Sequence, residues 1–359
     1  MRTPFTTDTQ RAWVDVDLDA IVRNARSYQG RVGVPLLPML KADAYGLGAL
    51  KIAKALQAVQ PMGWGVATTA EAVELRRAGF QEPIIVFTPL IAGQLAEHRT
   101  FGLRPVIGDL EALRGWLAAS EDPFHLEIDT GMRRAGLPWD DRGTLAAAGT
   151  LLHDRASWEG CFTHFHSAGA DDFATALQWE RFQAAIEMLG RRPPIVHAAN
   201  GAAGGDGDRY AGTLARPGIC LYGAGATGFA CEPVAALRAR IVALRAVQPG
   251  DTVSYGATWE ASRSTTIATL SVGYADGVHR TLSSVGSVEI GERRCPIVGR
   301  VTMDFTMVDI GDVPVEIGDV ATLFGGMITL DEQAANAGTI AYELLTSLGH
   351  RLPRIYHRS

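Results

Sequence analysis

The sequence predicts a (β/α)8 barrel followed by a mostly β domain, and three observations lead to this prediction. Between Trp13 and Tyr222, short apolar runs alternate with amphipathic segments of helical spacing. After Cys231, strand-like runs follow one another, separated by Gly, Pro and Asp turns, with few long helical patterns. With 359 residues, the chain is long enough for two hydrophobic cores.

The barrel prediction depends on the alternation in the N-terminal part. The apolar runs are LLPML at 36–40, GWGVA at 63–67, PIIVF at 83–87, FHLEI at 124–128, GCFTHF at 160–165 and PIVHAA at 194–199. Helical patterns such as Leu50 to Val59 and Thr69 to Ala78 lie between them. This rhythm is typical of a parallel sheet, and about eight such units fit a closed barrel better than an open doubly wound sheet, which stays the alternative.

The C-terminal part is predicted to be a separate β domain. Its strand-like runs are TVSYGATW, TTIATLSVGY, CPIVGRVTMDFTMVDI and VATLF, between Thr252 and Leu330. We expect the turn between the domains near Glu232 and Pro233. This divides the chain into a cofactor-binding barrel over residues 1–232 and a β domain over 233–359, with the first residues of the chain as candidates to join the β domain.

Charge and hydropathy argue against two classes of partner. The formal net charge is −6, and Lys and Arg are scattered singly, so no basic stripe could follow a nucleic-acid backbone. The opening stretch Met1 to Gln10 is polar and lacks the apolar core of a secretory signal, and no later run reaches membrane-spanning length. We therefore expect a cytoplasmic protein without a nucleic-acid or membrane partner.

The cysteines indicate neither a metal site nor a redox pair. Cys161, Cys220, Cys231 and Cys295 are far apart and form no CxxC or Cys/His cluster. We expect four reduced thiols and no bound metal.

Lys41 is the first candidate for chemistry. It ends the apolar run at 36–40 and precedes a turn that contains Gly46 and Gly48. In a barrel, the carboxyl ends of the strands form the face on which active sites are built. A lysine partly removed from solvent there loses its proton more easily, as a Schiff-base nucleophile requires. Taken alone, a lysine that reaches out of a strand end toward solvent is the more common explanation, so the neighbouring motifs decide between the two.

The segment KADAYG at 41–46 resembles the cofactor-lysine motif of alanine racemases, and the resemblance extends along almost the entire chain. Further segments follow in the family's order and at similar spacing: DTGMRRAG at 129–136, FTHF at 162–165, HAAN at 197–200, RPGICLYG at 216–223, VSYGATW at 253–259, VGYADG at 272–277 and VGRVTMDFTMV at 298–308. One such match is a weak signal, whereas this many in register are a strong one. The resemblance implies the cofactor pyridoxal 5'-phosphate and a head-to-tail homodimer in which each active site takes groups from both subunits.

The implied reaction is the racemisation of a small amino acid, an isomerisation that supplies D-alanine for the cell wall. It removes a proton from one side of a planar carbanion and returns one to the other, so it needs two acid/base groups on opposite faces. Lys41 is expected to be one of them. The family pattern implies that Tyr274 of GYADG is the other, reaching in from the partner subunit. A tyrosine ordinarily titrates near about 10, so nearby cations must favour its anion.

The resemblance also implies a hydrogen bond from Arg216 to the pyridine nitrogen of the cofactor. A guanidinium donates a hydrogen bond but not a proton, so the ring withdraws less charge than it would beside a carboxylate, which disfavours transamination. The phosphate is expected on Tyr45, on the backbone N–H groups of Gly218 and Ile219, and on the loop around Asn200 and Gly201. His164 is expected near the ring, Arg134 near the substrate carboxylate, and the backbone N–H of Met303 on that carboxylate.

Several positions depart from the family pattern, and three of them bear on the predicted site. Glu127 stands where many relatives carry a lysine modified to an anionic carbamate, and we hypothesise that its carboxylate holds Arg134 instead. Gly201 replaces a usual phosphate-binding serine, which puts the strength of cofactor binding in doubt. His350, just before RLPR at 351–354, takes the slot in which many relatives have a pocket tyrosine, and is expected at the cofactor pocket.

Alternatives remain open at this point. Serine or a broader range of small amino acids is the alternative to alanine, because one hydroxyl group changes little in a small pocket. A pyridoxal-phosphate decarboxylase of the same plan comes next, although such enzymes present a carboxylate where this chain has Arg216. A non-catalytic cofactor carrier comes last, because it would leave the β domain with Tyr274 unexplained.

Overall fold

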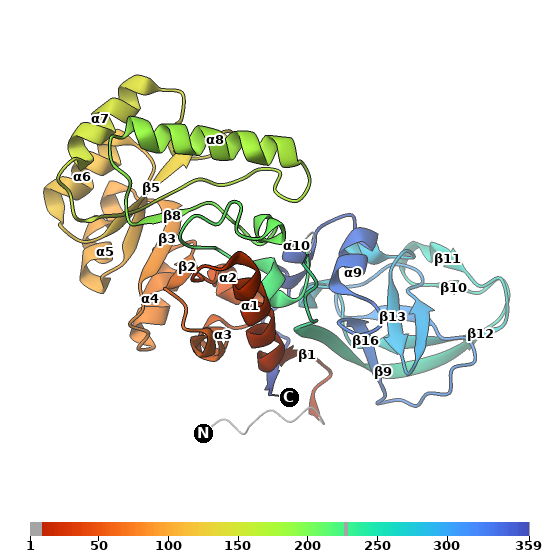
Figure 1. Cartoon of the computed structure of the whole chain (residues 1–359). Coiled ribbons are helices and arrows are strands. Elements are labelled where there is room, and N and C mark those ends of the chain that lie inside the picture. The colour runs from red at the N-terminus through yellow and green to blue at the C-terminus, as the bar shows by residue number, and fades with distance from the viewer. Residues whose placement is uncertain (1–8, 226–228, 359) are drawn as a thin grey trace.

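The computed structural model describes residues 9–225 and 229–358 (Figure 1). Residues 1–8 of the opening stretch, for which the sequence predicts no secretory signal, lie outside the described residues. The chain forms an N-terminal α/β part and a C-terminal β part that lie side by side (Figure 1). Within the described ranges, no helix combines the length and the apolar character that crossing a membrane requires.

Eight parallel segments close into a barrel. The sheet contains β2 (Trp64–Val66), β3 (Ile84–Pro89), β4 (Arg104–Ile107), β5 (Phe124–Asp129), β7 (Trp158–Phe162) and β8 (Ile195–His197), with the short β6 (Leu137–Pro138) beside β5. Residues 36–40 and 213–216 supply the remaining two segments. Parallel bridges join Met39 to Gly65, Leu36 to Ala215 and Asn200 to Arg216, which closes the ring. The predicted barrel is therefore confirmed.

Helices cover the outside of the barrel (Figure 1). They are α1 (Leu18–Val32), α3 (Ala49–Leu56), α4 (Thr69–Arg77), α5 (Leu95–Phe101), α6 (Leu110–Ala119), α7 (Arg142–Leu152) and α8 (Asp172–Met188). Five of them begin at an Asp or Thr side chain that accepts hydrogen bonds from first-turn amides: Asp17, Thr68, Asp109, Asp141 and Asp171. These caps satisfy backbone donors that a helix cannot satisfy itself.

The C-terminal part is a β domain built around one long strand, β9 (Ala235–Val247), which pairs with β1, β12 and β16. The other strands are β1 (Ala12–Asp17), β10 (Thr252–Val253), β11 (Trp259–Glu260), β12 (Thr265–Leu270), β13 (Ser287–Ile290), β14 (Arg293–Pro296), β15 (Thr306–Asp309), β16 (Val320–Phe324) and β17 (Arg354–His357). The domain also holds α9 (Leu330–Asn336) and α10 (Ala341–Thr346). Because β1 pairs with β9 and β17, the start of the chain belongs to this sheet.

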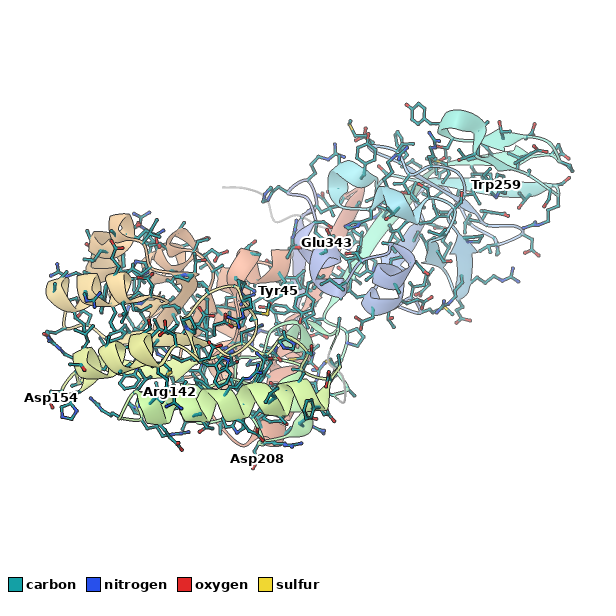
Figure 2. All side chains as sticks on the ribbon, turned by 90° about the horizontal axis from the view of Figure 1, so that it is seen from above. Tyr45, Arg142, Asp154, Asp208, Trp259 and Glu343 are labelled. Carbon is teal, nitrogen blue, oxygen red and sulfur yellow. The ribbon has the colours of Figure 1, made fainter. Side chains whose placement is uncertain are left out.

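The two parts meet where α10 packs against α2 (Lys41–Gly46). The connection between them is fixed by Asn24 on α1, whose side-chain amide donates to Glu232 O at 2.9 Å and accepts from Glu232 N at 2.8 Å. Figure 2 shows Tyr45 and Glu343 near this junction, whereas Trp259 marks the far end of the β domain. The barrel face that carries Lys41 is therefore next to the β domain.

Candidate active site

A cavity of about 160 Å³ opens at the carboxyl ends of the barrel strands. Its lining includes most of the predicted site residues, namely Lys41, Tyr45, Arg134, His164, Asn200, Gly201, Arg216 and Gly218, together with Met39, Phe87 and Tyr342. Ile219 is buried directly behind Gly218 and does not line the cavity. Residues from distant parts of the chain thus meet in one place.

Lys41 opens a left-handed turn. Residues 42–45 all have φ between +52° and +57°, although none of them is glycine. A left-handed conformation costs roughly 1–2 kcal/mol for each such residue, so the surroundings must stabilise it. Ala42 N donates to Glu71 Oε1 at 2.7 Å, and Ala49 N donates to Asp43 Oδ1 at 2.6 Å. The sequence predicts a turn at Gly46 and Gly48, but the structure begins it at Ala42, because contacts with other elements outweigh local preference.

Lys41 lines the cavity, and the pKa of its amine is below the ordinary value. Partial removal from solvent is the main cause, and the positive charges of Arg134 and Arg216 add to it, while Glu71 opposes them. A lower pKa increases the fraction of neutral amine at a given pH. Lys41 is therefore suited to attack a carbonyl carbon and to take up a proton.

Arg216 is buried, with 3% of its surface exposed, and its guanidinium is held firmly. It donates to His197 Nδ1 at 2.8 Å, to Thr163 O at 2.9 Å and to Ala198 O at 3.1 Å. Burial lowers its pKa to about 10, so it stays charged at neutral pH. A guanidinium has five N–H donors, and the three named bonds leave donors for a ligand in the cavity.

Two buried histidines extend the hydrogen bonds of Arg216 into a chain through the barrel. His197 Nε2 lies 2.8 Å from His125 Nδ1, and His125 Nε2 lies 3.2 Å from Glu159 Oε2. Because Arg216 can only donate, Nδ1 of His197 is an acceptor, and its Nε2 therefore donates to His125. His125 in turn donates through Nε2 to Glu159. Burial lowers the pKa of both histidines, which keeps them neutral. Neither histidine has a predicted role from the sequence, although the placement of a histidine inside each of the apolar runs at 124–128 and 194–199 is a signal that could have indicated one.

His164 also lines the cavity as a neutral imidazole. Burial, followed by the charges of Arg216, Arg134 and Lys41, lowers its pKa to about 3. It therefore carries no charge at any physiological pH. A neutral ring beside several cations can contact a planar ligand without adding to the positive charge.

The far end of the cavity is shaped by Tyr45 and two glycines. A Cβ atom on Gly218 would lie 2.5 Å from Tyr45 Oη, so only glycine permits this approach. A Cβ atom on Gly201 would lie 3.2 Å from the sulfur of Cys220, so a serine at this position would require Cys220 to shift slightly. Tyr45 is buried, yet its hydroxyl has no hydrogen-bond partner within residues 9–225 and 229–358. A buried hydroxyl at a cavity wall indicates a place for a polar ligand.

Asn200 organises the adjacent loop. Its side-chain oxygen accepts from Ala202 N at 3.1 Å and Ala203 N at 3.0 Å, at the start of the short helix η4 (Ala203–Asp206). Its backbone oxygen accepts from the Tyr28 hydroxyl at 2.6 Å. The side-chain oxygen is thus already engaged with the chain, so Asn200 shapes the cavity wall through its loop.

His350 does not lie at the cofactor pocket, where its place before RLPR predicts it. It is exposed in the turn between α10 and β17 and does not line the cavity. Tyr342, in the first turn of α10, lines the cavity instead, with its ring 5.8 Å from that of Tyr45. Burial raises the pKa of Tyr342 to about 12. The expectation is corrected because α10 packs on α2 and the chain has turned away by residue 350. The aromatic of TIAYE at 339–343 was the signal that pointed to it.

Glu127 and Arg134 line a neighbouring cavity of about 320 Å³ together with Lys41. Burial raises the pKa of Glu127 to about 7, although Arg134 and Arg216 oppose this shift. No direct hydrogen bond joins Glu127 to Arg134 among the described residues. The two side chains are brought together, but the direct pairing expected from the sequence is not formed.

Tyr274 and Met303 lie in a different cavity, on the β domain. It measures about 520 Å³ and is lined by Tyr255, Tyr274, Arg280, Arg300, Val301, Thr302, Met303 and Asp304. Tyr274 N donates to Thr302 O at 2.9 Å, and Ala275 N donates to Met303 O at 3.0 Å, so the two loops are joined. None of the lining residues comes from the barrel. Within one chain, Tyr274 and Lys41 therefore occupy separate cavities.

Comparison with known proteins agrees with this arrangement. The family models for the alanine racemase N-terminal and C-terminal domains match residues 16–226 and 234–356. An alanine racemase of Deinococcus radiodurans is 38% identical over 357 residues, covering 96% of this chain and 98% of that protein. One of Acidiphilium cryptum is 39% identical over 350 residues, covering 95% and 97%.

Solved structures give the same answer. Alanine racemase from Streptomyces coelicolor A3(2) superimposes with a TM-score of 0.91 at 31% identity, covering 98% of this chain and 99% of that one. Alanine racemase from Bartonella henselae, solved with covalently bound pyridoxal phosphate, gives a TM-score of 0.90 at 29% identity, covering 97% and 100%. The chain therefore belongs to the alanine racemase family.

Proposed function

We propose that this protein is an alanine racemase that interconverts L- and D-alanine with pyridoxal 5'-phosphate bound at Lys41. The observation that carries the proposal is the convergence of Lys41, Tyr45, His164 and Arg216 on one cavity. The family membership and the relatives named above support the same activity. In the cell, we propose that it works in the cytoplasm and supplies D-alanine for the cell wall.

The residues of the cavity fit the cofactor. Tyr45 offers a buried hydroxyl without a partner in the described part of the chain, beside a glycine turn whose amides suit a phosphate. Arg216 offers remaining N–H donors to a ring nitrogen, and Lys41 offers an amine of lowered pKa to an aldehyde. When bound, the cofactor supplies a conjugated system that withdraws electrons and acidifies the α-carbon of an amino acid.

The protein's own groups then hold the substrate and move its proton. Lys41 takes or returns the α-proton on one face. Arg134 is exposed at the cavity and forms no hydrogen bond or ion pair within residues 9–225 and 229–358, so its charge is available for the substrate carboxylate. Arg216 remains charged and would hold the ring nitrogen of the bound cofactor by a hydrogen bond without giving up its proton, which would limit the electron withdrawal that favours transamination.

Two-base chemistry requires a second subunit. We propose a head-to-tail homodimer in which Tyr274 and the backbone of Met303 of one copy complete the cavity of the other. Support comes from the separation of the two cavities and from the exposure of apolar side chains on the β domain: 73% for Tyr255, 43% for Tyr274 and 52% for Met303. Large apolar side chains gathered on one surface mark a contact site.

Complementation tests the shared sites. Lys41→Ala and Tyr274→Phe should each be inactive alone. In a mixed dimer, one site combines both substitutions and the other combines two native groups. Statistical reassociation of equal amounts should therefore restore about a quarter of the native activity. No recovery, although mixed dimers form, would contradict shared sites.

We propose that Glu127, at the position where many relatives carry a carbamate, acts on Arg134 through its charge across their shared cavity and without a direct hydrogen bond. Its support is the shared cavity, since the two groups line it together with Lys41. Glu127→Gln should weaken substrate binding more than cofactor binding, because Arg134 is the group for the substrate carboxylate. Unchanged KM and cofactor affinity would contradict this electrostatic role.

One experiment separates the rival activities. The purified protein, loaded with cofactor, is incubated in heavy water with single-enantiomer alanine. Inversion with deuterium at the α-carbon indicates a racemase, release of carbon dioxide indicates a decarboxylase, and neither indicates a carrier. Repeating the assay with serine and other small amino acids ranks the substrates, among which we expect alanine to lead.

A further inference from the structure

None of the proposed acid/base or cofactor-binding groups belongs to the RLPR segment at 351–354. It runs from the turn after α10 into the first residue of the end strand β17, and Arg354 contacts the barrel at Gly46. Its two arginines point to different partners. Their contacts connect it to both loops that carry the proposed acid/base groups.

Arg351 joins the two loops around Tyr274. Its Nε donates to Asp276 Oδ1 at 2.9 Å, and its Nη2 donates to Asp304 Oδ1 at 2.8 Å. Asp276 belongs to the short helix η7 (Tyr274–Asp276), and Asp304 directly follows Met303. One guanidinium thus holds the loop of Tyr274 against the loop of Met303.

Asp276 is a well-anchored partner for this contact. Its side chain is fully buried and also accepts from Arg11 Nη2 at 2.6 Å and from Gly273 N at 3.0 Å. Burial raises the pKa of Asp276, but the bonds from Arg11, Arg351 and Gly273 outweigh this and hold it below the ordinary value. The carboxylate is therefore ionised, and loss of an arginine would leave a buried charge poorly compensated.

Arg354 holds the turn that starts at Lys41. Its Nε donates to Gly46 O at 2.8 Å, and its other nitrogens donate to Leu348 O and Gly349 O at 2.8 and 2.7 Å. A Cβ atom on Gly46 would lie 2.6 Å from the carbonyl oxygen of Leu345, so the turn rests directly on the end of α10. The strained turn at 42–45 ends on this support.

Gly349 connects the two sets of contacts. Its N–H donates to Asp276 O at 2.9 Å, and its carbonyl oxygen accepts from Arg354. A single short stretch of chain therefore contacts the end of the Lys41 turn on one side and the Tyr274 loop on the other.

We propose that residues 351–354 are a positioning element for both acid/base groups, in which Arg351 fixes the loops that present Tyr274 and Met303, and Arg354 fixes the turn that carries Lys41. The proposal rests on the roles given to Lys41 and Tyr274 above. In the proposed dimer, the two groups serve different active sites. One segment would therefore set one group of each site, which matters because proton transfer depends on sub-ångström placement.

Amide hydrogen exchange on the full-length, cofactor-free protein tests the positioning directly. In Arg351→Met, exchange at residues 273–277 and 302–305 should rise about tenfold or more, with 42–48 unchanged. In Arg354→Met, exchange at residues 42–48 should rise by a similar factor, while exchange at 273–277 and 302–305 should stay unchanged. Arg293→Met is the matched control, because Arg293 is an exposed β-domain arginine that pairs with Asp312 at 2.7 Å. The control should alter neither region. Unchanged exchange in both loops, or equal increases in both loops for both variants, would overturn the proposal.

Isotope effects on the loaded enzyme provide a second readout. Because the acid/base groups face opposite sides of the α-carbon, each enantiomer loses its proton to only one of them. Arg351→Met should raise the primary α-deuterium effect for one enantiomer, and Arg354→Met should raise it for the other. A purely structural role would change the amount of active protein and neither isotope effect. Arg351→Lys should rescue only in part, because one ammonium cannot span both carboxylates as the guanidinium does.

The failure of the proposed function can be distinguished from the failure of this inference. Full racemisation by Tyr274→Phe would overturn the two-base proposal, and this inference with it. The positioning role alone would be overturned by a different result. Tyr274→Phe would then lose racemisation, while Arg351→Met and Arg354→Met would keep native exchange and native isotope effects.

Discussion

Replacing His197 with phenylalanine tests whether the buried chain of hydrogen bonds holds Arg216. The ring of His197 is stacked on Phe162 with centroids 5.0 Å apart, so a phenyl ring keeps this packing. It removes two hydrogen bonds, one from Arg216 and one to His125, each 2.8 Å long. The substitution therefore isolates the polar contribution of the imidazole.

The magnitude follows from the two lost partners. A hydrogen bond from a charged donor contributes about 1.5–3 kcal/mol, and a buried nitrogen of His125 left without its partner costs about 1–3 kcal/mol. A combined loss of about 4 kcal/mol should lower the unfolding midpoint of the barrel by about 10 °C. Calorimetry of the cofactor-free protein measures this without interference from cofactor loss. The pH should have little effect on the difference near neutrality, because burial keeps His197 unprotonated.

The same variant should change reaction specificity. With Arg216 less well held, we expect the ratio of transamination to racemisation to rise about tenfold, measured by pyruvate formation from alanine in the loaded enzyme. The matched control is His98→Phe. His98 is also buried, but its one side-chain hydrogen bond within the described ranges is to Gln94 O at 3.1 Å, and it does not line the cavity. A native midpoint and a native product ratio in His197→Phe would refute the reasoning.

Other predictions concern the cavity and its neighbours. Folding raises the pKa of Glu127 from 4.5 to about 7 and so disfavours its charged form. The wild type should therefore lose stability relative to Glu127→Gln as the pH rises from about 4.5 to 7. Unfolding midpoints of both proteins across pH 4–8 check this, and a constant difference would contradict it. Gly218→Ala should weaken cofactor binding at least about tenfold, because the new Cβ would lie 2.5 Å from Tyr45 Oη. Spectroscopic titration with the cofactor measures the affinity. Gly115→Ala is the control, because its added Cβ meets open space. Tyr342→Phe should reduce cofactor affinity about threefold to tenfold, whereas His350→Phe should leave the affinity unchanged. A larger loss of affinity in His350→Phe than in Tyr342→Phe would contradict the placement of Tyr342 at the cavity.

The sequence determined the architecture because local patterns report strands and helices directly. Apolar runs separated by helical segments led to the barrel, and they also located Lys41 at a strand end on the face where sites form. The motif segments then indicated most residues of the cofactor cavity. The participation of β1 in the C-terminal sheet stayed open, because strand pairing across more than 200 residues leaves no local signal.

Only the tertiary structure decided which side chains meet. Tyr342 rather than His350 reaches the cavity, because the packing of α10 on α2 decides this and spacing from a motif does not. The left-handed turn at 42–45 contradicts local propensity and exists because Glu71, β17 and α10 support it from elsewhere in the chain. The contacts of Arg351 and Arg354, and the histidine chain under Arg216, likewise join segments far apart in sequence. Such contacts depend on three-dimensional proximity, which a one-dimensional pattern does not encode.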